Sequence, residues 1–371
     1  MALFVPRLGK DKIETVVKPA PNKNEKFYDL PKPIGPPPYH LDLSRIIPVD
    51  KIVKSGEISF HILGDTGSTK TLDTTHMVEN AMEYDFGKHD ISFLFHVGDV
   101  IYNFGEADDY YSEFYEPYAH YPAPIFAIPG NKDGDCRPGS NEKSLAAFVT
   151  NFCAKKQEVT VDAGDINRWP MIQPNVYWTL EAPFVTIIGL YSNVPDGGVI
   201  KQDQLDWFKQ ELANAPKDKA LIIAVHHATF SADDEHSGSD VMLNVFDNAF
   251  AQSHRLPDAV FSGHVHNYQR FTRELDGHEI PYLVVGSGGH KLHKMQKNDN
   301  VIIKTPFKLP DRDDVTLESY CDDRYGFMRL EITADNLQGK FFSAGARHQD
   351  GFIHEKIDEF ELDLHKHKLV G

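Results

Sequence analysis

Residues 57–67 read EISFHILGDTG and residues 91–102 read ISFLFHVGDVIY, and this shared pattern decides the fold. In each stretch, a run of mostly apolar residues ends abruptly at a glycine that is followed by an aspartate. Nearly continuous apolar character over such short runs predicts strands that are buried on both faces. Glycine lets the backbone turn sharply, so the aspartate side chain is expected to project beyond the end of the strand.

Further apolar runs follow along the chain, and amphipathic helical stretches separate several of them. These runs occupy residues 123–128, 184–190, 219–225, 259–262 and 281–285. Apolar residues recur with helical spacing in segments 142–152, 202–215 and 240–250. Strands that alternate with helices predict a layered α/β domain.

The length of 371 residues is interpreted as one large domain with extensions, since no internal repeat is present. The expected boundaries are a proline-rich N-terminal extension over residues 1–54, a domain over residues 55–345 and a C-terminal extension over residues 346–371. Within the domain, the polar residues 291–320 are expected to form an insertion. Residues 325–343 predict a hairpin with its loop at residues 334–336.

Composition excludes several classes of protein. The chain is 41% hydrophobic and 25% charged, as ordinary globular proteins are, and its three cysteines cannot build a disulfide framework. A net charge of −17 repels phosphate backbones, which argues against a dedicated nucleic-acid or anionic-membrane binder.

The sequence also gives an expectation for location. No run of about 18 apolar residues is present, so no membrane span is predicted. The apolar stretch at the start is too short for a signal peptide, which predicts a cytoplasmic protein. A secreted or periplasmic location stays open for a chain that has lost a leader.

Polar clusters follow five of the predicted strands at the point where each strand ends. The side chains concerned are Asp65, Asp99, Tyr102, Asn131, His226, His227, His264 and His266. Loops beyond the carboxyl ends of parallel strands meet at one edge of a sheet, so we expect these side chains to converge. Their oxygen and nitrogen atoms suit Fe, Zn or Mn, and one carboxylate can bridge two such ions.

The blocks GDTG, GDVIY, GNKD, VHH and GHVH resemble the signature blocks of the calcineurin-like metallophosphoesterases. They are most similar to those of the purple acid phosphatases, whose second block carries a tyrosine three residues after the aspartate, as Tyr102 does here. The resemblance covers roughly residues 57–345. It implies a four-layer αββα sandwich with a dinuclear metal site at the carboxyl edge of the strands.

The resemblance also implies which residues hold the first metal ion, which is Fe(III) in that family. Asp65, Tyr102 and His266 would be its ligands, and Asp99 would bridge it to the second ion. Tyrosinate bound to Fe(III) gives a visible charge-transfer band in the family. A trivalent ion is the kind of neighbour that would keep a tyrosine deprotonated well below its ordinary pKa of about 10.

The second ion, a divalent Fe, Zn or Mn, would be held by Asn131, His226 and His264. His226 is preferred to His227 because the family's ligand lies two residues before a position that is commonly proline. His227 is therefore expected beside the ligands and not on a metal ion, and so is Asp133, which stands in the place of the family's acidic residue in the third block.

One block departs from the family pattern. Its third block normally reads Gly-Asn-His-acid, but Lys132 stands here in the place of that histidine. Lysine supplies positive charge to a phosphate oxygen but is a poor proton donor near neutral pH. His236 lies at the spacing of a second family histidine and is the candidate for contacting the phosphoryl group and protonating the leaving group.

The resemblance implies hydrolysis of phosphate monoesters through in-line attack by a metal hydroxide, without a phosphoenzyme. The expected partner is a phosphorylated small molecule or another phosphoester substrate. A phosphodiesterase acting on cyclic nucleotides or other diesters at the same site is the alternative within the enzyme class. Lys132 also leaves open a catalytically weak pseudo-enzyme that binds metal or phosphate. His61 and His96 lie within predicted strands and are interpreted as buried core histidines.

Overall fold

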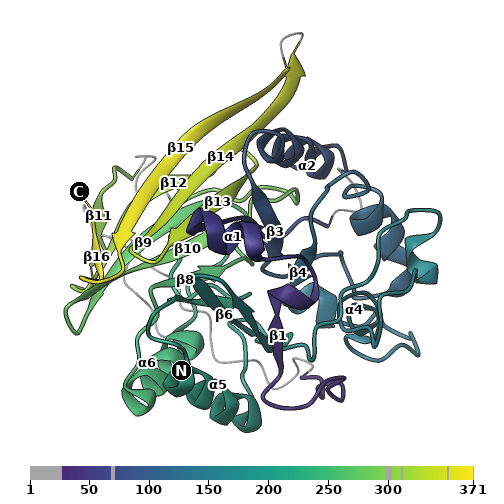
Figure 1. The fold of residues 1–371 in the computed structure, drawn as a ribbon, viewed down its shortest axis with the longest axis horizontal. Coiled ribbons are helices and arrows are strands. Elements are labelled where there is room, and N and C mark those ends of the chain that lie inside the picture. Colours follow the sequence, from purple (N-terminus) through teal and green to yellow (C-terminus); the bar gives the residue numbers. More distant parts are fainter. Residues whose placement is uncertain (1–26, 68–71, 297–302, 311, 349–350, 371) are drawn as a thin grey trace.

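The computed structural model describes residues 27–67, 72–296, 303–310, 312–348 and 351–370. Two β-sheets pack against each other, and helices flank them (Figure 1). The predicted αββα sandwich is confirmed.

The larger sheet has nine strands. In spatial order these are β1 (His40–Asp42), β5 (Trp178–Ala182), β6 (Val185–Leu190), β7 (Ala220–Val225), β8 (Ala259–Ser262), β10 (His278–Val285), β9 (Tyr268–Leu275), β12 (Val315–Cys321) and β11 (Phe307–Lys308). β6, β7 and β8 run parallel, so their carboxyl ends share one edge.

The smaller sheet has seven strands. In spatial order these are β16 (Lys368–Leu369), β15 (Gly351–Asp363), β14 (Asn336–His348), β13 (Gly326–Thr333), β2 (Glu57–Leu63), β3 (Ile91–His96) and β4 (Ile125–Ala127). β2, β3 and β4 are parallel and place their carboxyl ends together. β13 and β14 form the hairpin that the sequence predicts.

Helices connect and cover the sheets. They are α1 (Asp50–Ser55), α2 (Leu72–Phe86), α3 (Asn131–Gly134), α4 (Ala146–Phe152), α5 (Gln202–Asn214) and α6 (Asp240–Ser253), with single turns at Leu43–Arg45, Ala107–Asp109, Tyr111–Tyr115 and Val161–Ala163. α2 packs against β13, β14 and β15 of the smaller sheet. α5 and α6 pack together beside the larger sheet (Figure 1), where Thr179 Oγ1 of β5 donates to Glu211 of α5 at 2.5 Å.

Aromatic side chains join the two sheets. Trp178 of β5 is fully buried, and its ring lies 6.0 Å from that of Phe95 in β3 and 5.7 Å from that of Phe126 in β4, measured between centroids. Its indole N–H donates to the carbonyl oxygen of Ala127 at 3.1 Å, so burial leaves no unpaired donor there. This contact fixes β3 and β4 against the larger sheet close to their carboxyl ends.

The structure extends the sheets beyond the expected domain boundaries. The boundary predicted at residue 345 falls inside β14, and the following residues supply β15 and β16. A physical reason lies in residues 359–363, where polar and apolar residues alternate and Phe360 and Leu362 are buried, as suits a strand with one covered face. Likewise, the expected insertion 291–320 supplies β11 and most of β12, and the expected N-terminal extension supplies β1. Residues 1–26 of that extension lie outside the described part.

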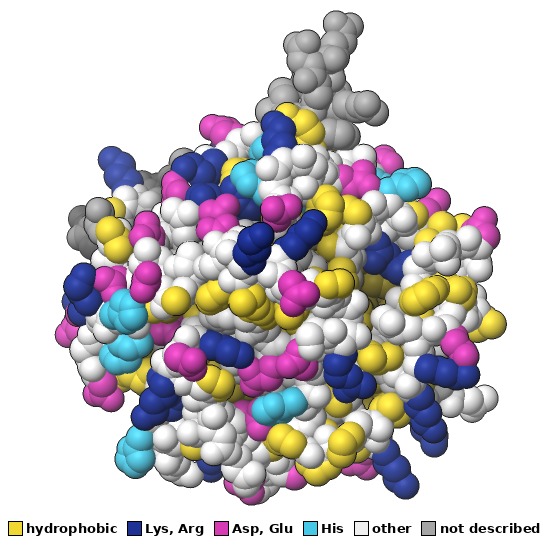
Figure 2. Space-filling model, viewed as in Figure 1, with side chains coloured by type: hydrophobic (Ala, Val, Ile, Leu, Met, Phe, Trp, Pro, Cys, Tyr) yellow, Lys and Arg dark blue, Asp and Glu magenta, His cyan; other side chains and the backbone are white. Residues whose placement is uncertain are grey.

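The surface of the described residues mixes charges of both signs. Figure 2 shows one face on which acidic side chains lie among lysines, arginines and histidines. Among the helices that the structure describes, none has both the length and the apolar character needed to cross a membrane.

A charged network lies buried beneath α2. Asp85 is 2% exposed and accepts hydrogen bonds from His61 Nε2 at 2.9 Å and from the guanidinium of Arg329. Burial opposes the charge on Asp85, but His61 and Arg329 outweigh it and lower the pKa of the carboxyl to about 2. His61 also lies 2.9 Å from the hydroxyl of Tyr121, which confirms it as a satisfied core histidine.

We predict that Arg329→Met lowers the free energy of unfolding by about 3 kcal/mol, because it removes one of the charged partners of a buried carboxylate. Urea denaturation measures the loss. Arg324→Met is the matched control, since Arg324 pairs with Glu355 at the surface and its removal should cost less than about 1 kcal/mol. Equal losses in the two variants would contradict the prediction.

Candidate metal centre

The site lies where the carboxyl ends of strands from both sheets meet. Loops after β2, β3 and β4 contribute Asp65, Asp99 and Asn131, and loops after β7 and β8 contribute the histidines. Asp65, Asp99 and His226 offer ligand atoms that lie within 4.8 Å of one another, and all three side chains are buried. The structure therefore brings together the side chains that the sequence places at separate strand ends.

Both carboxylates project from unusual backbone. Asp65 has a φ of 59° and Asp99 a φ of 54°, values in the left-handed region that cost roughly 1 kcal/mol or more for a residue with a side chain. The crowding is tight, because a Cβ atom on Gly130 would lie only 2.1 Å from Asp99 Oδ1. Only glycine fits at that position.

Tyr102 closes one side of the site. Its hydroxyl lies 3.2 Å from Asp65 Oδ1 and 3.1 Å from His266 Nε2. His266 Nδ1 lies 3.0 Å from the carbonyl oxygen of Lys291, which can only accept, so the ring carries its proton there and keeps a free electron pair on Nε2. The three side chains predicted to hold the first metal ion thus point at one another.

Asn131 organises the other side. Its Oδ1 lies 3.1 Å from His226 Nε2 and 3.1 Å from His264 Nδ1. His226 Nδ1 lies 2.9 Å from the carbonyl oxygen of Val97, which fixes the proton on Nδ1 and leaves Nε2 facing Asn131 and, at 3.3 Å, Asp99 Oδ1. These contacts bring together the side chains predicted for the second ion.

Negative charge accumulates in this buried space. Burial raises the pKa of Asp65 well above its usual range, and the charge of Asp99 adds to this effect. Burial and the same two carboxylates raise the pKa of Tyr102 above its ordinary value. Burial lowers the pKa of His226, but Asp99 reverses this effect and raises it to about 9. A bound cation would relieve this repulsion, so the donors present fit metal ions.

Asp133 ties two of the loops together. Its carboxylate accepts hydrogen bonds from the backbone N–H of Gly130 at 2.8 Å, of Val100 at 3.1 Å and of Ile101 at 3.3 Å. Burial, followed by the charge of Asp99, raises its pKa to about 7. It lies beside the candidate ligands and holds their loops.

His227 lies between Ser192 and His264. Its Nδ1 lies 2.7 Å from the hydroxyl of Ser192, and its ring centroid lies 4.4 Å from that of His264. His227 therefore lies beside the candidate ligand His264, while its Nδ1 contacts Ser192.

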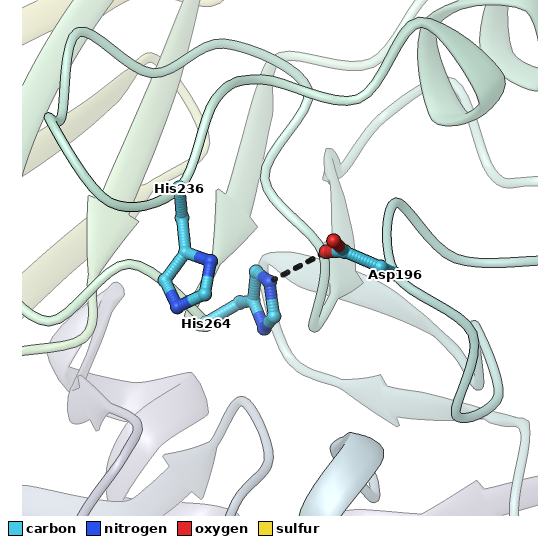
Figure 3. A group of neighbouring side chains, drawn as sticks. All are labelled: Asp196, His236 and His264. Carbon is cyan, nitrogen blue, oxygen red and sulfur yellow. Dashed lines mark ion pairs between the residues drawn. The ribbon is translucent and has the colours of Figure 1, made fainter. Parts of the chain in front are cut away.

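His236 and Asp196 lie on either side of His264, as Figure 3 shows. The ring of His236 lies 4.5 Å from that of His264, measured between centroids, and Asp196 Oδ1 lies 3.9 Å from His264 Nε2. The backbone N–H of His236 donates to the buried Asp233 at 2.8 Å, which fixes the loop that carries the imidazole. Lys132 contributes its backbone N–H to Asp99 Oδ1 at 2.8 Å.

Several residues that the sequence analysis does not select also contact the site. Glu113 accepts a hydrogen bond from the backbone N–H of Tyr102 at 2.7 Å. The ring of His290 stacks on that of Tyr102, with centroids 3.8 Å apart, and the ring of His293 stacks on that of His266 at 4.1 Å. The two histidines in GSGGHKLH, directly after an apolar strand, were the available signal.

The sequence of the chain is similar to those of known phosphoesterases. A family model for calcineurin-like phosphoesterases matches residues 58–268. Purple acid phosphatase 22 of Arabidopsis thaliana is 23% identical over 248 residues, which cover 63% of this chain and 51% of that protein. Purple acid phosphatase 18 of the same plant is 22% identical over 250 residues, covering 63% and 50%. The chain spans about half the length of these curated relatives.

Solved structures share the fold at low identity. A structure of PhoD superposes with a TM-score of 0.55 at 11% identity and covers 85% of this chain and 71% of that chain. GAP50, described as the anchor in the inner membrane complex of Plasmodium, gives a TM-score of 0.51 at 16% identity, covering 81% and 89%. These similarities concern the fold alone.

We predict that His226→Ala lowers the amount of metal bound per chain, because it removes a donor that faces both Asn131 and Asp99. His227→Ala is the matched control and should retain the metal content of the unaltered protein. Mass spectrometry of metals in freshly purified protein makes the measurement. Metal loss only in His227→Ala would make His227 the ligand in place of His226. Equal loss in both variants would contradict the assignment of His226 as the only ligand of the pair.

Proposed function

We propose that this chain, which belongs to the calcineurin-like phosphoesterase family, is a metal-dependent phosphatase that hydrolyses phosphate monoesters. The observation that carries the proposal is the convergence of donors from five loops on one buried space. The distant similarity to two purple acid phosphatases supports the narrower assignment.

The proposed ligands form two groups around a shared carboxylate. Asp65, Tyr102 and His266 would hold an Fe(III) ion, while Asn131, His226 and His264 would hold a divalent Fe, Zn or Mn ion. Asp99 lies between the two groups, with His226 Nε2 3.3 Å from its Oδ1. When bound, two such ions supply Lewis acidity that lowers the pKa of water and offsets negative charge on phosphoryl oxygens.

The chain's own residues position the substrate around this centre. The ring of His236 lies beside that of His264, from where its imidazole could contact the phosphoryl group and donate a proton to the leaving oxygen. Lys132, the second residue of α3, would add positive charge near the phosphoryl oxygens. Asp133 and Glu113 hold the backbone of the ligand-bearing loops through their hydrogen bonds.

A phosphodiesterase remains the alternative that a specific observation favours. Lys132 replaces the histidine of the family pattern, and a single flexible cation can accept a phosphate that carries a second ester group. The same replacement motivates a pseudo-enzyme that binds phosphate without turnover. All three hypotheses share the same metal centre. They differ in whether the protein hydrolyses its ligand and in whether that ligand is a monoester or a diester.

Hydrolysis assays distinguish these three hypotheses. We expect the metal-loaded protein to hydrolyse p-nitrophenyl phosphate faster than bis(p-nitrophenyl) phosphate. Asp99→Ala should lower the rate by more than the 10–100-fold loss typical of groups outside the coordination sphere, because it removes the shared carboxylate. Asp335→Ala, an exposed aspartate in the β13–β14 turn, is the control and should leave the rate unchanged. Faster hydrolysis of the diester would favour the phosphodiesterase, and no hydrolysis of either ester would favour the pseudo-enzyme.

The visible absorption spectrum tests the Fe(III) assignment separately. Tyrosinate bound to Fe(III) is expected to give a visible band, which Tyr102→Phe should remove because the phenyl ring offers no oxygen. Tyr110→Phe is the matched control, since Tyr110 is also fully buried but is not among the candidate ligands. Two bound metal ions without the band would contradict the Fe(III)–tyrosinate assignment while leaving a dinuclear site intact.

A further inference from the structure

His96 links the two loops that carry the carboxylates. It is the last residue of β3 and is fully buried. Its Nδ1 lies 3.2 Å from the backbone nitrogen of Gly98, and its Nε2 lies 2.9 Å from the hydroxyl of Thr66. Thr66 follows Asp65 and Gly98 precedes Asp99, so one imidazole contacts the neighbours of both carboxylates.

Hydrogen-bond chemistry fixes the state of this ring. The amide of Gly98 can only donate, so Nδ1 must be the acceptor and the neutral ring carries its proton on Nε2. That proton is donated to Thr66 Oγ1, whose own hydroxyl hydrogen is then directed to the carbonyl oxygen of Val100 at 3.5 Å. Burial lowers the pKa of His96 to about 3, so the ring stays neutral at ordinary pH. These hydrogen bonds therefore connect Thr66, in the loop after β2, with Gly98 and Val100, in the loop after β3.

Strained backbone needs such support. Asp65 and Asp99 both adopt positive φ, and residues in this region persist only where their surroundings hold them. Backbone bonds already join the loops, since the N–H of Asp65 donates to Gly98 and that of Thr66 to Asp99. His96 adds side-chain bonds at both strained turns.

We propose that His96 is a positioning residue that clamps the Asp65 and Asp99 loops to each other and so sets the spacing of the two carboxylates for metal binding. The inference rests on the proposed dinuclear site. It assigns to His96 a role beyond that of a satisfied core histidine.

Hydrogen–deuterium exchange of the metal-free protein tests the clamp directly. His96→Phe keeps an aromatic ring but loses both hydrogen bonds, so amides in residues 64–67 and 98–101 should exchange at least about tenfold faster. His96→Asn retains an acceptor near Nδ1 and His96→Gln a donor near Nε2, so each should restore part of the protection. Unchanged exchange in His96→Phe would overturn the clamp.

His61→Gln is the matched control. His61 is a fully buried histidine on the neighbouring parallel strand β2, but its nitrogens contact Tyr121 and Asp85 and not the two loops. This variant should lower the unfolding temperature without accelerating exchange in residues 64–67 or 98–101. Equal acceleration in His61→Gln and His96→Phe would mean that His96 acts only through general stability.

Metal titration provides the functional readout. His96→Phe should weaken binding of Mn²⁺ or Zn²⁺ by about tenfold, as is typical for partners outside the coordination sphere, whereas His61→Gln should not. Combining His96→Phe with Thr66→Val should cost less than the sum of the two single losses, because the hydrogen bond between His96 and Thr66 is lost in each of them. Faster exchange with unchanged metal affinity would overturn the role in metal binding. If the unaltered protein binds no metal, the proposed function fails, while the exchange experiment still decides whether the clamp exists.

Discussion

The repulsion between two buried carboxylates is the constraint on which the rest of the site depends. Asp65 and Asp99 lie close together without exposure to water, and both project from left-handed backbone. Part of the cost is offset locally, because Asp65 accepts from the backbone N–H of His264 and Asp99 from that of Lys132. His226 also offsets part of the cost at Asp99, while burial and the charge of Asp99 still raise the pKa of Asp65 well above its usual range, so a cation bound between the two carboxylates would relieve the remaining repulsion.

Much of the fold could be predicted from the sequence because buried parallel strands leave a clear signal. The run at residues 57–63 is the whole of β2, and the run at residues 219–225 contains all of β7. β9 and β15 are not predicted, because polar and charged residues interrupt their apolar positions, so neither segment forms a continuous apolar run. Segments expected to lie outside the domain therefore turned out to lengthen both sheets.

The residues of the candidate site also fall into those that could be predicted from the sequence and those that could not. Glycine after an apolar run marks a strand end, so residues such as Asp65, Asp99 and Asn131 could be selected from the sequence, and the structure brings them together. Asp196 and Glu113 could not be selected from the sequence. They reach the site through an irregular loop and a short helical turn, whose paths leave no periodic pattern in the sequence. The bond between His96 and Thr66 depends on a distance between two strand ends, which no local pattern contains.

The candidate ligands come from both sheets, with Asp65, Asp99 and Asn131 on one side and His226 and His264 on the other. Ions held by all of them would cross-link the sheets, so separation of the sheets would require release of the ions. A ligand that binds only the folded state stabilises it by about 2.7 kcal/mol at a free concentration one hundred times its dissociation constant. The amount of folded protein in a cell would then follow the supply of its metal ions, because a metal-starved chain unfolds more often and is degraded sooner.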